Sequence, residues 1–261
     1  MAASSKQQKV PSDGGSLPTA VAVVSDVHAN RHAFEAVLAD IATRKTDELW
    51  CLGDLVGYGA DPDACVELAI KHASISLAGN HDLAATGALA VDDFSELARV
   101  AALWTREHAA SSTLEYLNAL SPSATKAELG LYHASPRDPI WEYVVSPEQA
   151  AECFAVQPAR VGLIGHSHLA LAFFQQQGAP ADGHVHGDSE VVNWSTGRWL
   201  LNPGSVGQPR DGDRRAAWLE LDLATQTAIY HRVEYDIDGA IVAIAQAGLP
   251  SMLGERLRLG Q

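Results

Sequence analysis

Val21-Ala22-Val23-Val24-Ser25-Asp26-Val27-His28 is a short apolar run that ends in an acidic and an imidazole side chain. The same arrangement recurs four more times, with a polar motif directly after the apolar runs 49–52, 75–78, 129–132 and 161–164. Short continuous apolar runs are typical of strands buried in a sheet, and open α/β sheets bind ligands just beyond the carboxyl ends of their strands. The pattern therefore predicts an α/β fold with a polar site at the strand ends.

The five polar motifs share carboxylate, imidazole and amide groups and contain no thiolate. In chain order they are Ser25-Asp26-Val27-His28, Gly53-Asp54, Gly79-Asn80-His81-Asp82, His133 in a Leu-Tyr-His-Ala-Ser-Pro segment, and Gly165-His166-Ser167-His168. These groups suit borderline divalent ions better than a structural zinc site. Two ions that share a carboxylate could clamp both oxygens of an in-line phosphoryl displacement. Hydrolysis of a phosphate ester is therefore the leading hypothesis.

The ordered set D-x-H, G-D, G-N-H-D, H and G-H-x-H resembles the calcineurin-like metallophosphoesterase superfamily. The segments 25–30 and 202–207 are most similar to its small bacterial and archaeal phosphodiesterase branch, and the resemblance runs from about residue 20 to about residue 235. It implies an α/β fold that is a four-layer αββα sandwich with two packed mixed β-sheets. It also implies a phosphodiesterase that hydrolyses a small phosphodiester by in-line attack of a hydroxide bound to two metal ions.

The resemblance assigns a role to each position of the motifs. The residues that match Asp26, His28 and His168 hold the first metal in this family, those that match Asn80, His133 and His166 hold the second, and the one that matches Asp54 bridges both. The residue that matches His81 is the leaving-group acid or a phosphate-binding imidazole. Asp82, next in sequence, could orient the His81 ring. Two divalent ions are expected, manganese first, with iron, nickel, cobalt or zinc as the alternatives.

Two segments depart from the family pattern. Ala134 follows His133 where the branch more often has glycine, which predicts slight crowding of the site. The segment 53–59 lacks the Asp-Arg-Gly of the protein-phosphatase branch, so it provides no arginine to grip a terminal phosphate. Arg137 and Arg210 lie in loops that follow site motifs, and each could contact a nonbridging oxygen or a second phosphate, with a plain surface position as the alternative.

Two other functions remain open beside the phosphodiesterase. One is a phosphomonoesterase, including a phosphoprotein phosphatase or a dinucleoside polyphosphate hydrolase. The other is a non-catalytic scaffold of the same fold that binds proteins. Such scaffolds typically lose several ligands or the residue that matches His81, and this chain keeps all of them.

Not every motif or histidine points to a metal. Gly53-Asp54 alone is typical of a turn, and only the ordered set of five favours a site. The remaining histidines have structural readings: His32, His72 and His108 on helix faces, His184 and His186 in a solvated hairpin loop, and His231 in a strand.

Composition predicts one folded domain over residues 19–261 after a disordered polar tail at 1–18. The chain has 261 residues and a formal net charge of −14, which argues against duplex nucleic acid as a partner and leaves a small phosphoester. No apolar run reaches the length of a membrane span, and the first 18 residues lack the apolar stretch of a signal peptide, so we expect a cytoplasmic protein. Three cysteines without a C-x-x-C pair predict no disulfide, and Cys51 is expected in the core.

Periodicity predicts the order of the elements. A βαβαβ start uses the strands 21–25, 49–52 and 75–78 and the helices 31–44 and 62–71. A loop over 83–91 and a helical stretch over 92–120 follow. A capped helix begins at Ser146-Pro147-Glu148, and a helix at 238–247 closes the chain. The predicted strands of the second half are 127–133, 160–164, 169–174, 185–194, 198–201, 216–221 and 227–234.

Overall fold

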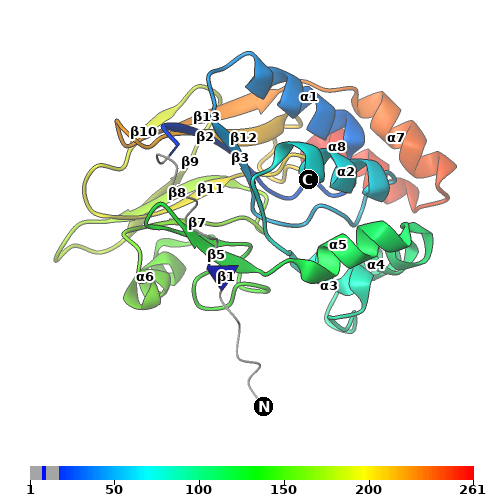
Figure 1. Cartoon of the computed structure of the whole chain (residues 1–261), viewed down its shortest axis with the longest axis horizontal. Coiled ribbons are helices and arrows are strands. Elements are labelled where there is room, and N and C mark those ends of the chain that lie inside the picture. The colour runs from blue at the N-terminus through cyan, green and yellow to red at the C-terminus, as the bar shows by residue number, and fades with distance from the viewer. Residues whose placement is uncertain (1–7, 10–17) are drawn as a thin grey trace.

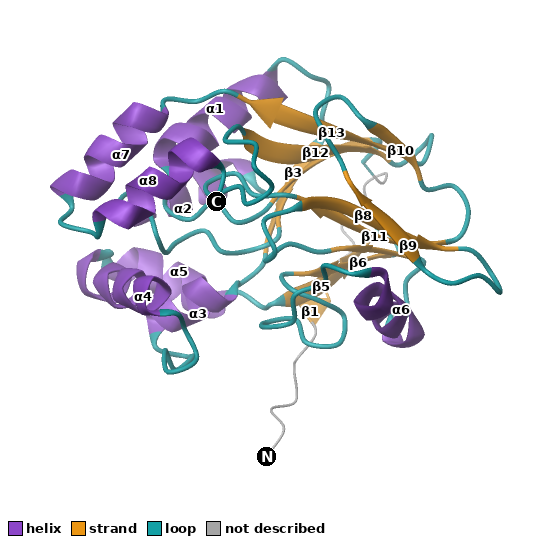
Figure 2. Ribbon diagram, turned by 180° about the vertical axis from the view of Figure 1, so that it is seen from behind, coloured by secondary structure: helices purple, strands orange, loops and turns teal. Residues whose placement is uncertain are grey.

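A computed structural model describes residues 8–9 and 18–261 of the chain (Figure 1). Two mixed β-sheets pack face to face, and helices cover the outer face of each sheet (Figures 1 and 2). This arrangement confirms the predicted four-layer αββα sandwich. None of the helices in the described ranges is both long and apolar enough to cross a membrane.

The first sheet carries the predicted βαβαβ start. Over the described residues it has six strands in the order β10-β13-β12-β2-β3-β4. The strands are β2 (Ala20–Val24), β3 (Glu48–Cys51), β4 (Ile75–Ser76), β10 (Val191–Asn193), β12 (Ala216–Asp222) and β13 (Thr227–Val233). β2, β3 and β4 run parallel, joined by α1 (Arg31–Ala42) and α2 (Pro62–His72), while β12, β13 and β10 add antiparallel neighbours.

The second sheet is built mainly from the middle of the chain. Its strand order is β1-β5-β6-β7-β11-β8-β9 across the described ranges. The strands are β1 (Gln8–Lys9), β5 (Ser123–Lys126), β6 (Leu129–Tyr132), β7 (Val161–Leu163), β8 (Ala170–Gln175), β9 (Asp182–Val185) and β11 (Arg198–Pro203). β6, β7 and β11 are parallel. β5 is antiparallel to β6 and parallel to β1, and β8 is antiparallel to both β11 and β9. The carboxyl ends of β6 and β7 therefore lie together.

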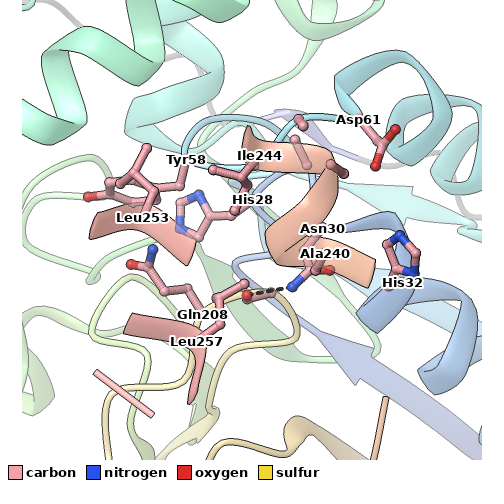
Figure 3. Close-up of a pocket in the computed structure, with 15 residues that line it drawn as sticks. His28, Asn30, His32, Tyr58, Asp61, Gln208, Ala240, Ile244, Leu253 and Leu257 are labelled. Carbon is pink, nitrogen blue, oxygen red and sulfur yellow. Dashed lines mark hydrogen bonds between the residues drawn. The ribbon is translucent and has the colours of Figure 1, made fainter. Parts of the chain in front are cut away.

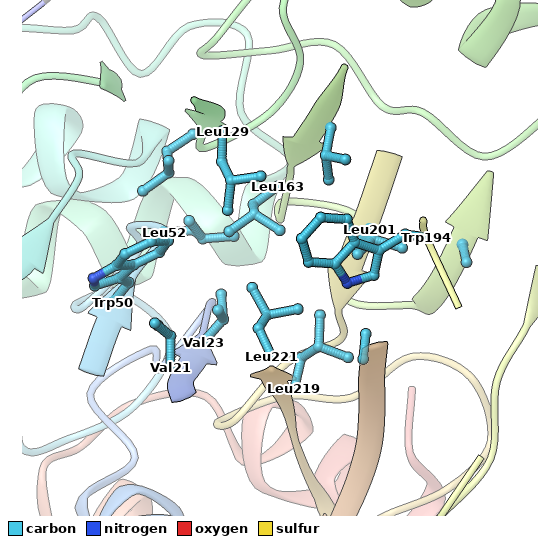
Figure 4. Close-up of a cluster of buried hydrophobic side chains, with 14 of the residues drawn as sticks. Val21, Val23, Trp50, Leu52, Leu129, Leu163, Trp194, Leu201, Leu219 and Leu221 are labelled. Atoms are coloured by element: carbon cyan, nitrogen blue, oxygen red, sulfur yellow. The ribbon is translucent and has the colours of Figure 1, made fainter. Parts of the chain in front are cut away.

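Side-chain alternation along β2 explains why the sheets stack. Val21 and Val23 point into the core between the two sheets, and Ala22 and Val24 point outward against α1 and α2. Figure 4 shows the inter-sheet core, in which Trp50 and Leu52 of the first sheet face Leu129 and Leu163 of the second. A strand that is apolar on both faces needs cover on both faces, so this sequence requires the helical outer layer.

The remaining helices cover three different surfaces. α3 (Asn80–Thr86), α4 (Glu96–His108) and α5 (Ser111–Ala119) form a group at one end of the sandwich (Figure 2). α6 (Pro147–Val156) packs on the outer face of the second sheet and begins at the predicted Ser146 cap. α7 (Ile237–Gln246) and α8 (Ser251–Leu259) pair with each other beside α1.

Several predicted element boundaries are wrong for local reasons. The predicted strand 127–133 is a hairpin of β5 and β6, joined at Ala127 and Glu128, which both have positive φ. A two-residue turn of this kind usually shows Asn-Gly, and this sequence gives no such signal. The predicted strand 185–194 is interrupted after β9 and resumes at β10. The predicted loop over 83–91 is helical as far as Thr86, because Asp82 caps α3.

One prediction near the C-terminus needs correction, and the predicted tail at the N-terminus stays a prediction. The helix near 238–247 does not close the chain, because α8 follows after Gly248 and Pro250. In the predicted disordered tail at 1–18, Gln8–Lys9 form a strand parallel to β5, and residues 1–7 and 10–17 lie outside the described residues.

The histidines outside the motifs have structural roles. His32, His72 and His108 lie on helices as predicted. His184 is in the strand β9 rather than in a loop. His186 stacks on Tyr230 and pairs with Glu190, and His231 in β13 stacks on Trp218.

The three cysteines agree with the prediction of no disulfide. All are free and buried within the described residues. Cys51, the last residue of β3, lies in the core between the first sheet and the helices α1 and α2.

Candidate metal centre

The five motifs meet where strands of both sheets end. Asp26, Asp54 and Asn80 follow the parallel strands β2, β3 and β4 of the first sheet, and His133, His166 and His168 follow β6 and β7 of the second. Because parallel strands end at the same edge, the motifs converge across the two sheets. All seven predicted ligands are at most 3 % exposed: Asp26, His28, Asp54, Asn80, His133, His166 and His168.

Asp26, His28 and His168 form the first group. Nε2 of His168 lies 3.4 Å from Oδ1 of Asp26 and 3.0 Å from Nε2 of His28. Nε2 of His28 is 3.9 Å from the same Asp26 oxygen. One ligand atom from each residue therefore points to a common centre, as three ligands of one ion must.

Asn80, His133 and His166 form the second group together with Asp54. Nε2 of His133 lies 3.2 Å from Oδ1 of Asn80 and 3.6 Å from Oδ2 of Asp54. The ligand atoms of Asp54, His133 and His166 all lie within 4.8 Å of one another. This set matches the predicted second ligand group.

Asp54 lies between the two groups. Its Oδ2 atom is 3.7 Å from Nε2 of His28 and 3.6 Å from Nε2 of His133, one imidazole from each group. Its other oxygen, Oδ1, accepts a hydrogen bond from the backbone N–H of His81 at 2.9 Å. The carboxylate is thus fixed by one oxygen and directs the other toward both groups.

The donor atoms fit a pair of cations. Among the described residues, Oδ1 of Asp26, Oδ2 of Asp54 and Nε2 of His166 are buried without a hydrogen-bond partner. Buried polar atoms nearly always have partners, so three orphans in one place need an explanation. Divalent ions at the two groups would satisfy all three atoms, and the nitrogen and oxygen donors suit borderline metals.

The outer ring nitrogens determine which atom of each histidine faces the centre. Nδ1 of His28, His133 and His168 lies 3.1, 3.0 and 2.6 Å from the backbone oxygens of Val56, Leu52 and Gln208. A ring nitrogen that faces a carbonyl carries the hydrogen, so each Nε2 presents a lone pair to the centre. The facing lone pairs of His28 and His168 repel each other unless a cation lies between them.

The ligand residues also have an unusual backbone. Asp26, His28, Asp54, His166 and His168 all have φ between +51° and +64°. Residues with side chains rarely adopt this left-handed region, and such strain gathers at functional sites. The sharp turns aim successive side chains of one motif, such as Asp26 and His28, at the same point.

Glycine is required where two motifs approach each other. A Cβ atom on Gly79 would lie 1.9 Å from Oδ1 of Asp54. A Cβ atom on Gly165 would lie 2.0 Å from Oγ of Ser25. The glycines of the third and fifth motifs are therefore needed for close packing against the carboxylate motifs.

Burial determines the charge states of the protein groups. Burial raises the pKa of Asp26 to about 7. It also raises the pKa of Asp54 well above its ordinary value, and the neighbouring Asp82 carboxylate adds to this second shift. Burial lowers the pKa values of His28, His166 and His168. Burial thus disfavours the charged forms of these two carboxyl groups and three imidazoles, and nearby cations act in the opposite direction on the carboxylates.

His81 lies beside the two groups. Its ring centroid is 5.0 Å from that of His28 and 4.4 Å from that of Tyr58. Nδ1 of His81 is buried and has no hydrogen-bond partner in the described part of the chain. Burial, with Arg210 and His133, lowers the pKa of His81 to about 3, so its imidazole is neutral at pH 7 before an anion approaches.

The predicted role of Asp82 is wrong. Its carboxylate does not bond the His81 ring. One oxygen accepts the backbone N–H of Val56 at 3.1 Å and the other accepts that of Gly79 at 2.9 Å. Asp82 is the cap that starts α3 and joins the second motif to the third, because its side chain points back toward the preceding turn.

The structure separates the two candidate arginines. Arg137 pairs with Glu142 and Glu152, away from the ligands. Arg210 donates to the Tyr58 hydroxyl at 3.4 Å, and its charge lowers the pKa values of His28, His81 and His168. Of the two, only Arg210 faces the centre.

The loop after β11 supports the site from behind. The Asn202 side chain donates to the carbonyl of Gly165 at 2.8 Å and to Oγ of Ser167 at 3.0 Å. The Ser205 hydroxyl donates to the carbonyl of Asp26 at 2.8 Å. This loop therefore ties the first motif to the fifth, which links the two sheets.

Sequence reasoning missed the aromatic residues around the ligands. Tyr58 lies against His28, Phe94 against His81 and Tyr143 against His166, with centroid distances of 4.7, 5.0 and 4.1 Å. Figure 3 shows Tyr58 and His28 beside an apolar pocket whose other wall is α7 and α8. The sequence feature that could have identified Tyr58 is its position in the Gly-rich loop after Asp54.

Comparisons with known proteins agree with this geometry. A model of the calcineurin-like phosphoesterase superfamily domain matches residues 20–224. An uncharacterized protein of Methanocaldococcus jannaschii is 36% identical over 247 residues, which cover 92% of this chain and 98% of that protein. A metallophosphoesterase crystal structure from Sphaerobacter thermophilus has 39% identity and a TM-score of 0.83, covering 94% of this chain and 100% of that one. A hypothetical protein from Pyrococcus horikoshii shares the fold, with 18% identity and a TM-score of 0.75. The match covers 93% of this chain and 98% of that one.

Proposed function

Since this chain belongs to the calcineurin-like phosphoesterase superfamily, we propose that it is a dinuclear metal-dependent phosphodiesterase that hydrolyses a small phosphodiester. One observation carries the proposal. Oδ2 of Asp54 is buried, has no hydrogen-bond partner among the described residues, and lies at 3.7 and 3.6 Å from one imidazole of each ligand group. That position is the one a shared carboxylate between two ions requires.

The residues of the candidate centre have separate roles in the proposed reaction. Two divalent ions held here would lower the pKa of a water molecule and neutralise charge on the phosphoryl oxygens. Asp26, His28 and His168 would hold one ion, Asn80, His133 and His166 the other, and Asp54 both. As water attacks phosphorus in line, the bond to the leaving oxygen breaks, and that oxygen needs a proton.

His81 and Arg210 are the groups left to contact the substrate. His81 follows the ligand Asn80 and has an unpartnered ring nitrogen, so it can donate a hydrogen bond to the leaving oxygen or to a phosphoryl oxygen. An anionic phosphate nearby favours the protonated imidazole. Arg210 supplies positive charge to the same side.

A diester is favoured over a monoester by the supply of cationic groups. The loop after Asp54 has no arginine, and Arg137 is occupied by two glutamates. A phosphomonoester dianion would have only Arg210 of the two candidates to balance its extra charge. A singly charged diester needs less positive charge from the protein.

The proposal is tested with two esters that release the same leaving group. Protein reconstituted with manganese should hydrolyse bis(p-nitrophenyl) phosphate with a higher kcat/KM than p-nitrophenyl phosphate. A chelator should abolish the activity, and Mn²⁺ should restore it better than Mg²⁺, because imidazole ligands suit manganese more than magnesium. Full activity in protein shown by elemental analysis to be metal-free would overturn the mechanism, and a preference for the monoester would overturn the substrate class.

A further inference from the structure

Helix α8 brings an additional arginine to Tyr58, which lies beside the candidate metal centre. Leu253 and Leu257 of this helix are buried and line the same pocket as Tyr58 and His28 (Figure 3). Arg256 lies between them in sequence and one helical turn after Leu253, so it emerges from the same side of α8. The superfamily model ends at residue 224, which places α8 outside the matched segment.

Arg210 and Arg256 converge on one tyrosine. Their Cζ atoms lie 5.7 and 5.9 Å from the centroid of the Tyr58 ring. Each distance is within the range of a cation–π contact. The centroid of the Tyr58 ring in turn lies 4.7 Å from that of His28 and 4.4 Å from that of His81, so the ring beside both guanidinium groups also contacts two imidazoles of the candidate site.

Both guanidinium groups donate hydrogen bonds to oxygen atoms. Arg210 donates to the Tyr58 hydroxyl and, at 3.0 Å, to Oε1 of Gln208, and Nε of Arg256 donates to the backbone oxygen of Gln261. Over residues 8–9 and 18–261, no Asp or Glu side chain forms an ion pair with either arginine. Other arginines of this acidic chain do have such partners, namely Arg137, Arg215, Arg232 and Arg258.

Two guanidinium groups beside the same ring repel each other. Burial and the charge of Arg210 lower the pKa of Arg256. A phosphate bound between the two would remove the repulsion, and guanidinium groups bind phosphate with paired hydrogen bonds. In a chain of net charge −14, two neighbouring arginines that form no ion pair with an Asp or Glu side chain of the described residues indicate an anionic ligand.

We propose that Arg210 and Arg256, both beside Tyr58, form a second anion subsite that binds a further phosphate group of the substrate. The proposal rests on the phosphodiesterase function and narrows it. The substrate is a phosphodiester with a second phosphate about one sugar ring away from the scissile one, because the tyrosine ring separates the subsite from the metal ligands.

The test uses two nucleoside esters that differ only in the second phosphate. They are thymidine 5′-(p-nitrophenyl phosphate) and the same ester with a 3′-phosphate, both followed by release of p-nitrophenolate from the manganese-loaded protein. The wild-type KM should be roughly tenfold lower for the 3′-phosphorylated ester, the size expected for hydrogen bonds between charged groups. In Arg256→Gln the ratio of the two KM values should fall to about one, and in Arg256→Lys it should be intermediate.

Arg258→Gln is the matched control. It makes the same charge change two residues further along α8, where Arg258 is exposed and paired with Asp238, and it should keep the wild-type ratio. A wild-type ratio near one, or an unchanged ratio in Arg256→Gln, would overturn the subsite.

If neither ester is hydrolysed, the proposed function fails instead, and calorimetry still decides the subsite. Thymidine 3′,5′-bisphosphate should then bind about tenfold more tightly than thymidine 5′-monophosphate to the wild-type protein and equally to Arg256→Gln. Equal binding of the two nucleotides by the wild-type protein would reject the subsite.

Discussion

At the scale of single residues, the candidate centre is defined by atoms that point inward without partners. Asp26, Asp54 and His166 each direct such an atom at the same region, within the described part of the chain. The second atom of each carboxylate is bonded to a backbone N–H, from His166 for Asp26 and from His81 for Asp54. One oxygen of each carboxylate is thus held by the backbone while the other stays available to an ion. These hydrogen bonds fix the side chains before any ion binds, which is how outer contacts tune a metal site.

The bridging role of Asp54 gives the first prediction. Asp54→Asn should abolish metal-dependent hydrolysis, because an amide supplies less negative charge to two ions than a carboxylate does. The loss should exceed the roughly 10–100-fold effect typical of changes around, rather than in, a ligand shell. Steady-state kinetics and elemental analysis would measure it, with the exposed Asp92→Asn as the control. Near-normal turnover with two bound ions would remove Asp54 from the bridging position.

His81 gives the second prediction, which is independent of metal binding. His81→Ala should keep both ions and slow esters with poor leaving groups by about 10²–10⁴-fold, the range of general acid catalysis. Nitrophenyl esters should be affected much less, since a nitrophenolate hardly needs a proton. The exposed His72→Ala is the matched control. Equal slowing of both ester types would make His81 a phosphate-binding group, and loss of metal would place it among the ligands.

At the scale of elements, α3 positions the third motif through its cap. Asp82 accepts the backbone N–H groups of Gly79 and Val56, so the start of α3 is attached to the loop that carries Asp54. The carboxylate is fully buried and its pKa is raised, chiefly by burial and against the effect of these hydrogen bonds. The helix start and the bridging residue are therefore held as one unit.

The third prediction follows from this cap. Asp82→Asn should lower the free energy of unfolding by about 1.5–3 kcal/mol, because its amide group can accept only one of the two N–H donors. Chemical denaturation of the metal-loaded protein would measure the change. The variant should keep the wild-type ratio of rates for good and poor leaving groups, since Asp82 does not contact the His81 ring. A ratio that changes as in His81→Ala would restore the orienting role.

At the scale of the whole molecule, the two sheets meet at the centre. The first sheet supplies Asp26, His28, Asp54 and Asn80, and the second supplies His133, His166 and His168. Each ligand group contains residues from both sheets. A bound ion is therefore a cross-link between the two halves of the sandwich in addition to its chemical role.

The fourth prediction concerns this cross-link. An ion that binds only the folded protein stabilises it by about 4 kcal/mol at a thousand times its dissociation constant. Addition of Mn²⁺ to metal-free protein should therefore raise Tm, and a chelator should lower it again, in calorimetry without substrate. Asp54→Asn should show a smaller rise than wild type. An unchanged Tm in the wild-type protein would show that the seven residues hold no ion.

The sequence by itself determined the placement of the ligands at strand ends. Each apolar run is local, and burial on both faces makes it a strand whatever lies elsewhere in the chain. Asp26, Asp54 and His133 therefore follow β2, β3 and β6 as predicted. The family resemblance carried by the ordered motifs predicted the layers, and the structure brings all seven predicted ligands together.

Only the tertiary structure decided which other side chains reach the centre. Asp82 caps α3 and does not bond the His81 ring, and Arg137 pairs with glutamates. Arg256 lies on α8, a helix that the sequence did not predict. A long or flexible side chain can point to several neighbours, so its partner depends on packing between elements far apart in the chain. Periodicity encodes which face of an element is buried, and it carries no information about what that face meets.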